Sequence, residues 1–313
     1  MKAYFWLLMA AILAAAGAVS AQPFPARHVR IITAAAGGGS DFATRLIAAP
    51  LAAALGQQVI VDNRGLLAAD IAAKAPADGY TLLLSGQTLW LLPFMRENVA
   101  SNAGDFAPIT LATETANILV VHPTLPVKSV KELMSLARAR PGQLNFATSG
   151  VGNSVHIAGE LFRSMAAVDV VRVNYKAASQ ALTDLIAGQT QFMFAVPGSS
   201  LPHVRAGRLR AIAVTSAKPT ALAPGLPAVA QAVPGYEVAS RLAIFAPAGT
   251  PAPIVNRLNQ EIARVVGRAD VKEKFLATGI EAVSSTPEEL AALIQSEMNR
   301  MGKVIKAAGI RAD

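Results

Sequence analysis

The stretch from Val29 to Asp41 reads VRIITAAAGGGSD and decides how the first part of the chain folds. Its β-branched start is typical of a strand, and the helical stretch that follows reaches Leu55. Three consecutive glycines between them let the backbone turn sharply, and Ser40 is placed to cap the helix. The stretch therefore predicts a strand, a glycine turn and a helix, the first unit of an α/β sheet.

The same alternation of short β-branched runs and helical stretches continues along the chain. Further strands are expected at 59–61, 80–84, 144–147, 170–173, 192–194, 209–214 and 242–245. A Pro/Gly-rich connection at 218–235 and a second crossing near 121–123 indicate two doubly wound units. We expect a discontinuous first lobe of residues 22–122 plus 236–313, with residues 123–235 inserted as a second lobe.

The first residues predict export from the cytoplasm. A positive Lys2 precedes an apolar run from Phe5 to Ala16, and small residues end at Ala21, as in a signal peptide cut after Ala21. An uncleaved anchor is the alternative, but the run is shorter than the ~20 residues of a membrane span. A soluble periplasmic mature chain is therefore expected.

Composition excludes several classes of function. Hydrophobic residues make up 53% of the chain and charged residues 15%, enough for one or two ordinary cores. The absence of cysteine excludes disulfides, thiolate metal sites and a cysteine nucleophile. The net charge of +8 falls by one when Lys2 is removed, and the surplus attracts anions. Scattered Lys and Arg with only 5% aromatics argue against nucleic-acid binding.

Two glycine turns between a strand and a helix are the candidate binding elements. Such turns point backbone N–H groups and the positive end of the helix dipole at a carboxylate or phosphate. In open α/β sheets ligands bind outside the carboxyl ends of strands, so the turns are expected to face each other across a cleft. The first turn comprises Ala35, Ala36, Gly37, Gly38, Gly39, Ser40 and Asp41, and the second comprises Ser149, Gly150, Gly152, Asn153 and Ser154. His156, in the first turn of the second helix, is either a donor to the anion or a partly buried packing residue.

The sequence gives little support for a nucleotide site, a metal site or a catalytic site. Phe42 stands where a dinucleotide fingerprint needs its last glycine, and no Gly-Lys-Ser/Thr follows, so nucleotides are disfavoured. The histidines lie far apart without metal-ligand spacing, so no metal and no cofactor is expected. A serine hydrolase is the only enzymatic alternative, and no serine lies in a Gly-x-Ser-x-Gly elbow. Its candidate nucleophiles are Ser149, Ser154, Ser199 and Ser200.

Motifs along the whole mature chain resemble those of a known family. They are VRII followed by GGGSD, then VDNR ending at Arg64, ADGYTL, DFAP, KSVKEL, PGQLNF and APAGTP ending at Pro251. Together they are similar to the tripartite tricarboxylate transporter receptors, also called Bug receptors. The resemblance implies an α/β, two-lobed periplasmic binding protein fold (type II-like), each lobe a doubly wound mixed sheet with flanking helices.

The resemblance also implies a function. Such a receptor is not an enzyme: as a monomer it captures a small organic carboxylate and delivers it to membrane permease subunits of a tripartite transporter. An alternative partner is a membrane sensor kinase. The ligand carboxylate is implied to lie at the two glycine turns. Ser85, Gly86 and Gln87 match another cleft segment of the family, and Phe194 and Ala195 lie in the segment where side chains tune the far end of the ligand.

Two departures from the family concern the ligand. After Arg64 the family usually continues with a glycine-rich stretch, whereas this chain has the apolar Leu66-Leu67, which predicts a ligand with an apolar body. Ala195 stands where many members have Asp, so an amino-acid ligand is disfavoured.

Overall fold

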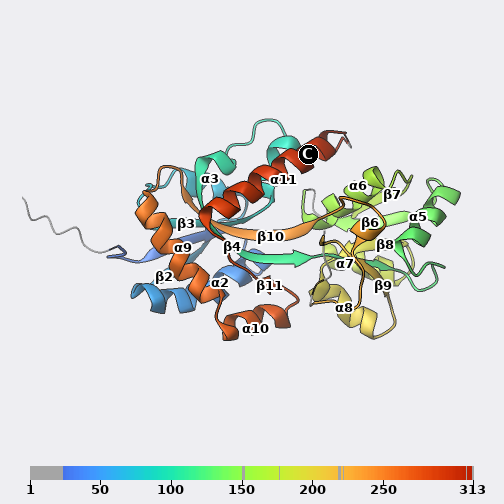
Figure 1. Ribbon diagram of the computed structural model, residues 1–313, viewed down its shortest axis with the longest axis horizontal. Helices are drawn as coiled ribbons and strands as arrows, with labels where there is room; N and C mark the ends of the chain where they lie inside the picture. Colours follow the sequence, from blue (N-terminus) through green and yellow to red (C-terminus); the bar gives the residue numbers. More distant parts are fainter. Residues whose placement is uncertain are drawn as a thin grey trace, which may run out of the picture.

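A computed structural model describes residues 24–149, 152–175, 177–217, 220, 222–307 and 309–311 of the chain (Figure 1). The expected signal peptide, its cut after Ala21, and Gly150 of the second glycine turn lie outside the described residues. Within the described ranges, no helix combines the length and the apolar composition that a membrane crossing requires. The described residues form two lobes, and each lobe is built on one sheet.

The first lobe contains a six-stranded mixed sheet in the order β11-β4-β10-β3-β1-β2. Its strands are β1 (Val29–Thr33), β2 (Val59–Asn63), β3 (Thr81–Gly86), β4 (Phe106–Ala116), β10 (Ala239–Pro247) and β11 (Glu281–Ala282). Strands β2, β1 and β3 are parallel neighbours, whereas β10 runs antiparallel between β3 and β4. The helical elements are α2 (Gly39–Leu55), η1 (Gly65–Leu67), α3 (Ala68–Ala73), α4 (Thr88–Leu91), η2 (Leu92–Phe94), η3 (Ala103–Asp105), α9 (Ala252–Val266), α10 (Ala269–Ala277) and α11 (Pro287–Ala307).

Alternation along the strands places side chains on both faces of this sheet. Val29 and Ile31 pack in the cluster that contains buried residues of α2 and α9. Ile32 and Leu83 point to the opposite face and pack in the cluster that contains Trp90 and buried residues of α11. Both faces are therefore covered by helices, which explains why these strands are continuously apolar.

The second lobe contains a five-stranded mixed sheet in the order β7-β6-β8-β5-β9. Its strands are β5 (Ile118–Val121), β6 (Asn145–Ser149), β7 (Val171–Tyr175), β8 (Phe192–Ala195) and β9 (Arg210–Val214). Strand β6 is parallel to β7 and β8, and β5 is antiparallel to β8 and β9. Its helical elements are α5 (Val130–Ala139), α6 (Ser154–Met165), α7 (Ala178–Ile186), α8 (Pro197–Arg205) and η4 (Val229–Gln231). The expected pair of mixed, helix-covered sheets is confirmed.

The chain passes between the lobes along β4 and β10, which lie side by side (Figure 1). Ala116 of β4 pairs with Ala239 of β10, and Asn117 alone separates β4 from β5. Thr215 joins the two crossings, because its amide donates to the Asn117 carbonyl at 2.9 Å and its hydroxyl to the Val238 carbonyl at 2.6 Å.

Both crossings differ by a few residues from the expected boundaries at 122 and 236. Strand β5 hydrogen-bonds to β8 and β9, so it belongs to the second lobe and the first crossing falls at Asn117. Tyr236 packs against Phe194 of the second sheet, and its hydroxyl donates to the Ala158 carbonyl at 2.9 Å. The second crossing therefore falls near Val238.

Candidate functional site

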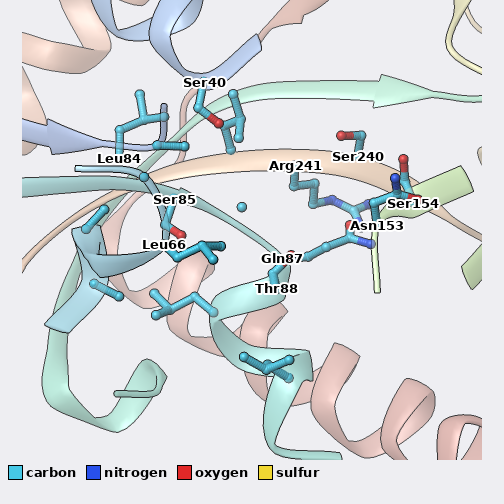
Figure 2. A pocket seen from close by; sticks show the side chains of 18 of the residues that line it. Ser40, Leu66, Leu84, Ser85, Gln87, Thr88, Asn153, Ser154, Ser240 and Arg241 are labelled. Carbon is cyan, nitrogen blue, oxygen red and sulfur yellow. The ribbon is translucent and has the colours of Figure 1, made fainter. Parts of the chain in front are cut away.

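A cleft of about 690 Å³ separates the two lobes (Figure 2). The loops that follow β1, β2, β3, β6 and β8 line it, together with the start of β10. Carboxyl ends of parallel strands from both sheets thus converge on one space, the usual position of ligands in α/β folds. The polar lining residues include Ser40, Ser85, Gln87, Thr88, Ser101, Ser149, Asn153, Ser154 and Ser240.

Of the first glycine turn, only Ser40 lines the cleft, beside Ala34, which precedes the turn. The other members do not line it: Ala35, Ala36, Gly37, Gly38, Gly39 and Asp41. Ser40 is not the cap of α2: the N-cap is Gly38, which has no side chain, and Ser40 lies inside the helix. The first residues of α2 carry amides without intrahelical partners, so the positive end of α2 still lies beside the cleft.

Asp41 and Asn63 hold this turn in place. The Asp41 carboxylate accepts hydrogen bonds from the Gly37 amide at 2.9 Å, from Asn63 Nδ2 at 3.0 Å and from Arg45 Nε at 2.9 Å. Hydrogen bonds from the Gly37 amide and then from Asn63 hold the pKa of Asp41 below its usual value. Asp41 therefore positions the turn, and its carboxylate is already occupied.

Replacing Asn63 with alanine is expected to loosen the first glycine turn. The Asn63 amide also donates to the Ala34 carbonyl at 2.9 Å and accepts from Arg45 at 3.0 Å. We expect the variant to lose about 1–2 kcal/mol of unfolding free energy, as for one or two net hydrogen bonds. Chemical denaturation measures this loss, and hydrogen exchange should show faster exchange at Gly37. The exposed Asn299→Ala on α11 is the control and should stay within about 0.5 kcal/mol of the parent; an equal effect of both variants would contradict the account.

The second glycine turn also meets the cleft in part. Ser149, Asn153 and Ser154 line it, and Gly152 does not. Asn153 caps α6, because its Oδ1 accepts from the His156 amide at 2.9 Å. Ser154 and Val155, the first two residues of α6, thus present helix-start amides at the cleft, with no preceding helical carbonyl to accept them.

His156 lies behind the second turn and outside the cleft lining. Its side chain is buried, Nδ1 accepts from the Gly152 amide at 3.0 Å, and Nε2 lies 2.6 Å from Arg172 Nη1. Burial, and then the nearby Arg172 and Arg163, lower the pKa of His156 to about 4. The ring is therefore neutral near pH 7 and supports the loop, as the packing alternative expected.

Gln87 is the side chain most clearly prepared for a ligand. It is 7% exposed, lines the cleft, and directs its amide toward the place where Arg241, Asn153 and Ser154 meet (Figure 2). In the described part of the chain this amide has no hydrogen-bond partner, although the Gln87 carbonyl accepts from Trp90 and Leu91. A polar solute atom in the cleft would therefore hydrogen-bond to this amide without displacing a protein partner.

Arg241 also lines the cleft, but its guanidinium is committed. Nε lies 2.8 Å from Glu114, Nη2 lies 3.2 Å from Glu237, and Nη1 pairs with Glu297. Burial alone would lower the pKa of Arg241, but Glu297 and Glu114 more than offset it and raise the pKa above its usual value. Arg241 thus ties β10 to β4 and α11.

Phe194 and Ala195 lie in the core and not in the cleft lining. Both are fully buried in β8, where Phe194 stacks on Tyr236 with ring centroids 6.1 Å apart. Ala195 pairs with Ile118 of β5. The next residue, Val196, is the one that reaches the cleft from this strand.

One wall of the cleft is apolar. Leu66 is fully exposed, lines the cleft and lies in η1, directly after β2. The other apolar lining residues include Ala68, Ala69, Leu84, Leu89, Leu92, Val99 and Val155. Sequence reasoning found Leu66 but missed Arg96, Ser101 and the start of β10, which no local motif marks.

The charged lining residues are few. Those in the cleft are Asp70, Arg96 and Arg241. In the described ranges, no group of three or more His, Asp or Glu side chains is arranged to hold a metal ion.

Known proteins are similar to this chain along almost its whole length. Residues 43–310 match the model of the "Tripartite tricarboxylate transporter family receptor". A UPF0065 protein from the tcbD-tcbE intergenic region of Pseudomonas sp. (strain P51) is 36% identical over 90% of this chain and 86% of its own. The solved structure of R. palustris Rpa4515 with adipate is 35% identical, with a TM-score of 0.77 over 92% of this chain and 99% of that one. The periplasmic binding protein BugD is 26% identical, with a TM-score of 0.75 over 93% and 100%.

These matches confirm the family expected from the motifs and the periplasmic binding protein fold, and they overturn the serine hydrolase alternative. The chain belongs to the tripartite tricarboxylate transporter receptor family, whose members bind solutes and do not transform them.

Proposed function

We propose that this receptor works in the periplasm and binds a small organic acid by its carboxylate, in the cleft between the lobes. The observation that carries the proposal is the Gln87 side-chain amide, which points into the cleft (Figure 2) and has no hydrogen-bond partner among the described residues. The adipate held by the related R. palustris structure supports a carboxylate as the solute.

Backbone and side-chain donors from both lobes would share the carboxylate. The amino ends of α2 and α6 border the cleft at Ser40 and Ser154, and a helix start favours a negative charge. Gln87 would donate from its amide, and the Ser85 side chain also points into the cleft (Figure 2). Because donors come from both lobes, a bound solute would favour their closure.

The apolar wall would hold the rest of the solute. Leu66 exposes its whole side chain there, and burying a leucine contributes roughly 1.5–3 kcal/mol. The expected ligand is therefore a carboxylate with an apolar or aromatic body.

Closure would turn about the paired crossings at Asn117 and Val238. Two adjacent single-strand connections allow a hinge rotation without disturbing either sheet. In this proposal the first lobe comprises the described residues up to 116 and from 239 onward, and the inserted lobe lies between them.

The proposed partner is the permease of a tripartite transporter, which accepts the solute from the closed receptor. Export by cleavage after Ala21 would place the monomeric receptor in the periplasm. A membrane sensor kinase is the other partner that a closed, loaded receptor could dock on. Pull-down of the loaded protein with each membrane component distinguishes them.

Gln87→Leu tests the proposed binding mode. The variant should bind the carboxylate about 10–100-fold more weakly, as expected for a hydrogen bond to a charged group. Its melting temperature without ligand should stay unchanged or rise, because the Gln87 amide loses no partner in the described structure. Calorimetric titration against carboxylates, neutral amides and sugars measures the first effect, and thermal unfolding the second.

The matched control is Gln58→Leu, an exposed glutamine outside the cleft lining. It should leave carboxylate affinity unchanged. Binding of neutral amides or sugars but of no carboxylate would contradict the proposed function.

A further inference from the structure

We infer that a backbone contact between Gly198 and Gly279 is a stop that limits how far the two lobes open, and that it thereby tunes the affinity of the cleft. The inference rests on the proposed function, because it takes rotation about the crossings at Asn117 and Val238 as given.

The two glycines belong to different lobes. Gly198 lies at the start of α8 in the inserted lobe, and Gly279 follows α10 in the first lobe; the two helices are neighbours in Figure 1. A Cβ atom added to Gly198 would lie 2.3 Å from the Thr278 carbonyl oxygen, and one added to Gly279 would lie 2.6 Å from the Gly198 nitrogen. Ordinary contacts of a Cβ atom begin near 3.4 Å. The lobes therefore meet backbone to backbone, at a distance that only glycine permits.

Both segments that form the contact are held within their own lobe. The Thr278 and Ile280 amides donate to the Phe275 carbonyl at 2.9 and 3.1 Å, and the Phe275 side chain is fully buried. In the inserted lobe, the Ser200 amide and hydroxyl donate to the Val196 carbonyl at 3.1 and 3.0 Å. Neither segment can retreat without breaking these hydrogen bonds, so pressure on the contact acts on the lobes as whole bodies.

The contact and the cleft lie on opposite sides of the crossings. In the first sheet, β4 and β10 carry the crossings, and the cleft is lined from β10 and from the loops after β3, β1 and β2. Strand β11, which begins two residues after Gly279, lies beyond β4. Rotation that widens the cleft therefore presses the two glycines together, whereas rotation that closes the cleft moves them apart.

A hydrogen bond on the same side opposes closure. The Thr220 hydroxyl of the inserted lobe donates to the Glu281 carboxylate of β11. A hydrogen bond to a charged acceptor is among the stronger ones, and closure would pull its partners apart. The glycine contact blocks further opening and this bond resists closing, so together they fix the arrangement of the lobes.

The arrangement of the lobes bears on affinity because donors from both lobes share the solute. When only a fraction of the molecules is closed, the apparent affinity falls by that fraction. An added methyl group at Gly198 would push the lobes apart beside β11 and tilt them together over the cleft. Gly198→Ala should therefore favour closure and tighten binding, although residue 198 lies outside the cleft lining.

The first measurement is the distance between the lobes without solute. The chain has no cysteine, so Lys74→Cys and Gln180→Cys, at exposed positions, place one spin label on each lobe. Lys74 ends α3 and Gln180 lies in α7, two helices that border the cleft. Electron–electron resonance should give a distance shorter by about 1 Å or more in Gly198→Ala, since its methyl group must retreat from 2.3 to near 3.4 Å.

The second measurement is affinity. Hexanoate and benzoate are titrated calorimetrically into the parent and into Gly198→Ala, and the variant should bind about 3–10-fold more tightly. The control is Gly267→Ala at the exposed end of α9, where φ is −73° and alanine fits. It should leave both the label distance and the affinity unchanged.

Thr220→Val supplies an independent variant, because it removes the hydrogen bond to Glu281 without adding bulk. It should also shorten the label distance and tighten binding, by about 2–5-fold. If Gly198→Ala does not fold, Thr220→Val decides the question by the same two measurements.

The outcomes separate the stop from the proposed function. An unchanged or longer label distance in the deciding variant, or weaker binding by it, would overturn the stop while carboxylate binding stands. Failure of both acids to bind the parent counts against the proposed function, and the label distance then decides on the stop alone.

Discussion

Replacing Arg241 with methionine should lower the free energy of unfolding by about 3–5 kcal/mol, the loss expected when one partner of a buried ion pair is removed. Arg241 is 5% exposed and Glu297 is 6% exposed, so the variant leaves the Glu297 carboxylate buried without its cation. Denaturant unfolding followed by fluorescence measures the loss. Trp90 is the sole tryptophan after residue 21, and its Nε1 donates to Glu297 at 2.7 Å, so the probe sits within the affected cluster.

A second substitution separates the lost charge pairing from lost packing. In the Arg241→Met background, Glu297→Gln removes the unpaired charge and keeps an acceptor for Trp90, so it should restore part of the stability. In the parent protein the same Glu297→Gln change should be destabilising. A loss below about 1 kcal/mol for Arg241→Met alone would show that the cluster does not hold β4, β10 and α11 together.

The stability of the protein should also fall by about 3 kcal/mol as the pH drops from 6.5 to 4, through His156 alone. Burial lowers the pKa of His156 to about 4, against an ordinary value of 6.5. Between these values the unfolded chain binds a proton that the folded chain does not, so acid favours unfolding. Above pH 6.5 the contribution of His156 is fully present, and below about pH 4 no more of it is lost.

The His156→Gln variant isolates this effect. Glutamine retains a neutral acceptor for the Gly152 amide and does not titrate, so the unfolding free energy of the variant should depend less on pH between 4 and 6.5. Denaturant unfolding of both proteins at half-unit pH intervals gives the difference. Parallel profiles over this interval would show that His156 is not held neutral by its surroundings. Asp41, whose pKa is also lowered, acts in a separate window below its ordinary value of 3.8.

The strands and their order along the chain were largely accessible from the sequence, because buried parallel strands are short, β-branched and continuously apolar. The positions at which the chain crosses between the lobes were harder to predict from the sequence. Only Asn117 separates β4 from β5, and no glycine or proline stands at the junction, so no turn signal marks the change of sheet. Tyr236 was misplaced for a related reason, since its partner Phe194 is 42 positions earlier in the sequence.

The candidate site, like the fold, could be predicted from the sequence only in part. The two glycine turns were expected beside the cleft from their local position between strand and helix, and Gln87 only from the family resemblance; Ser40, Ser149, Asn153, Ser154 and Gln87 line the cleft. The sequence could not show that Gly37 is bonded to Asp41, or that His156 turns away from the cleft to contact Gly152 and Arg172.

A crystal structure of the protein with a bound carboxylate tests the central claim most directly. We expect one carboxylate oxygen within hydrogen-bond distance of the Gln87 amide, and the group as a whole within reach of the first amides of α2 and α6. A carboxylate bound elsewhere, with Gln87 left without a partner in a closed cleft, would contradict the account.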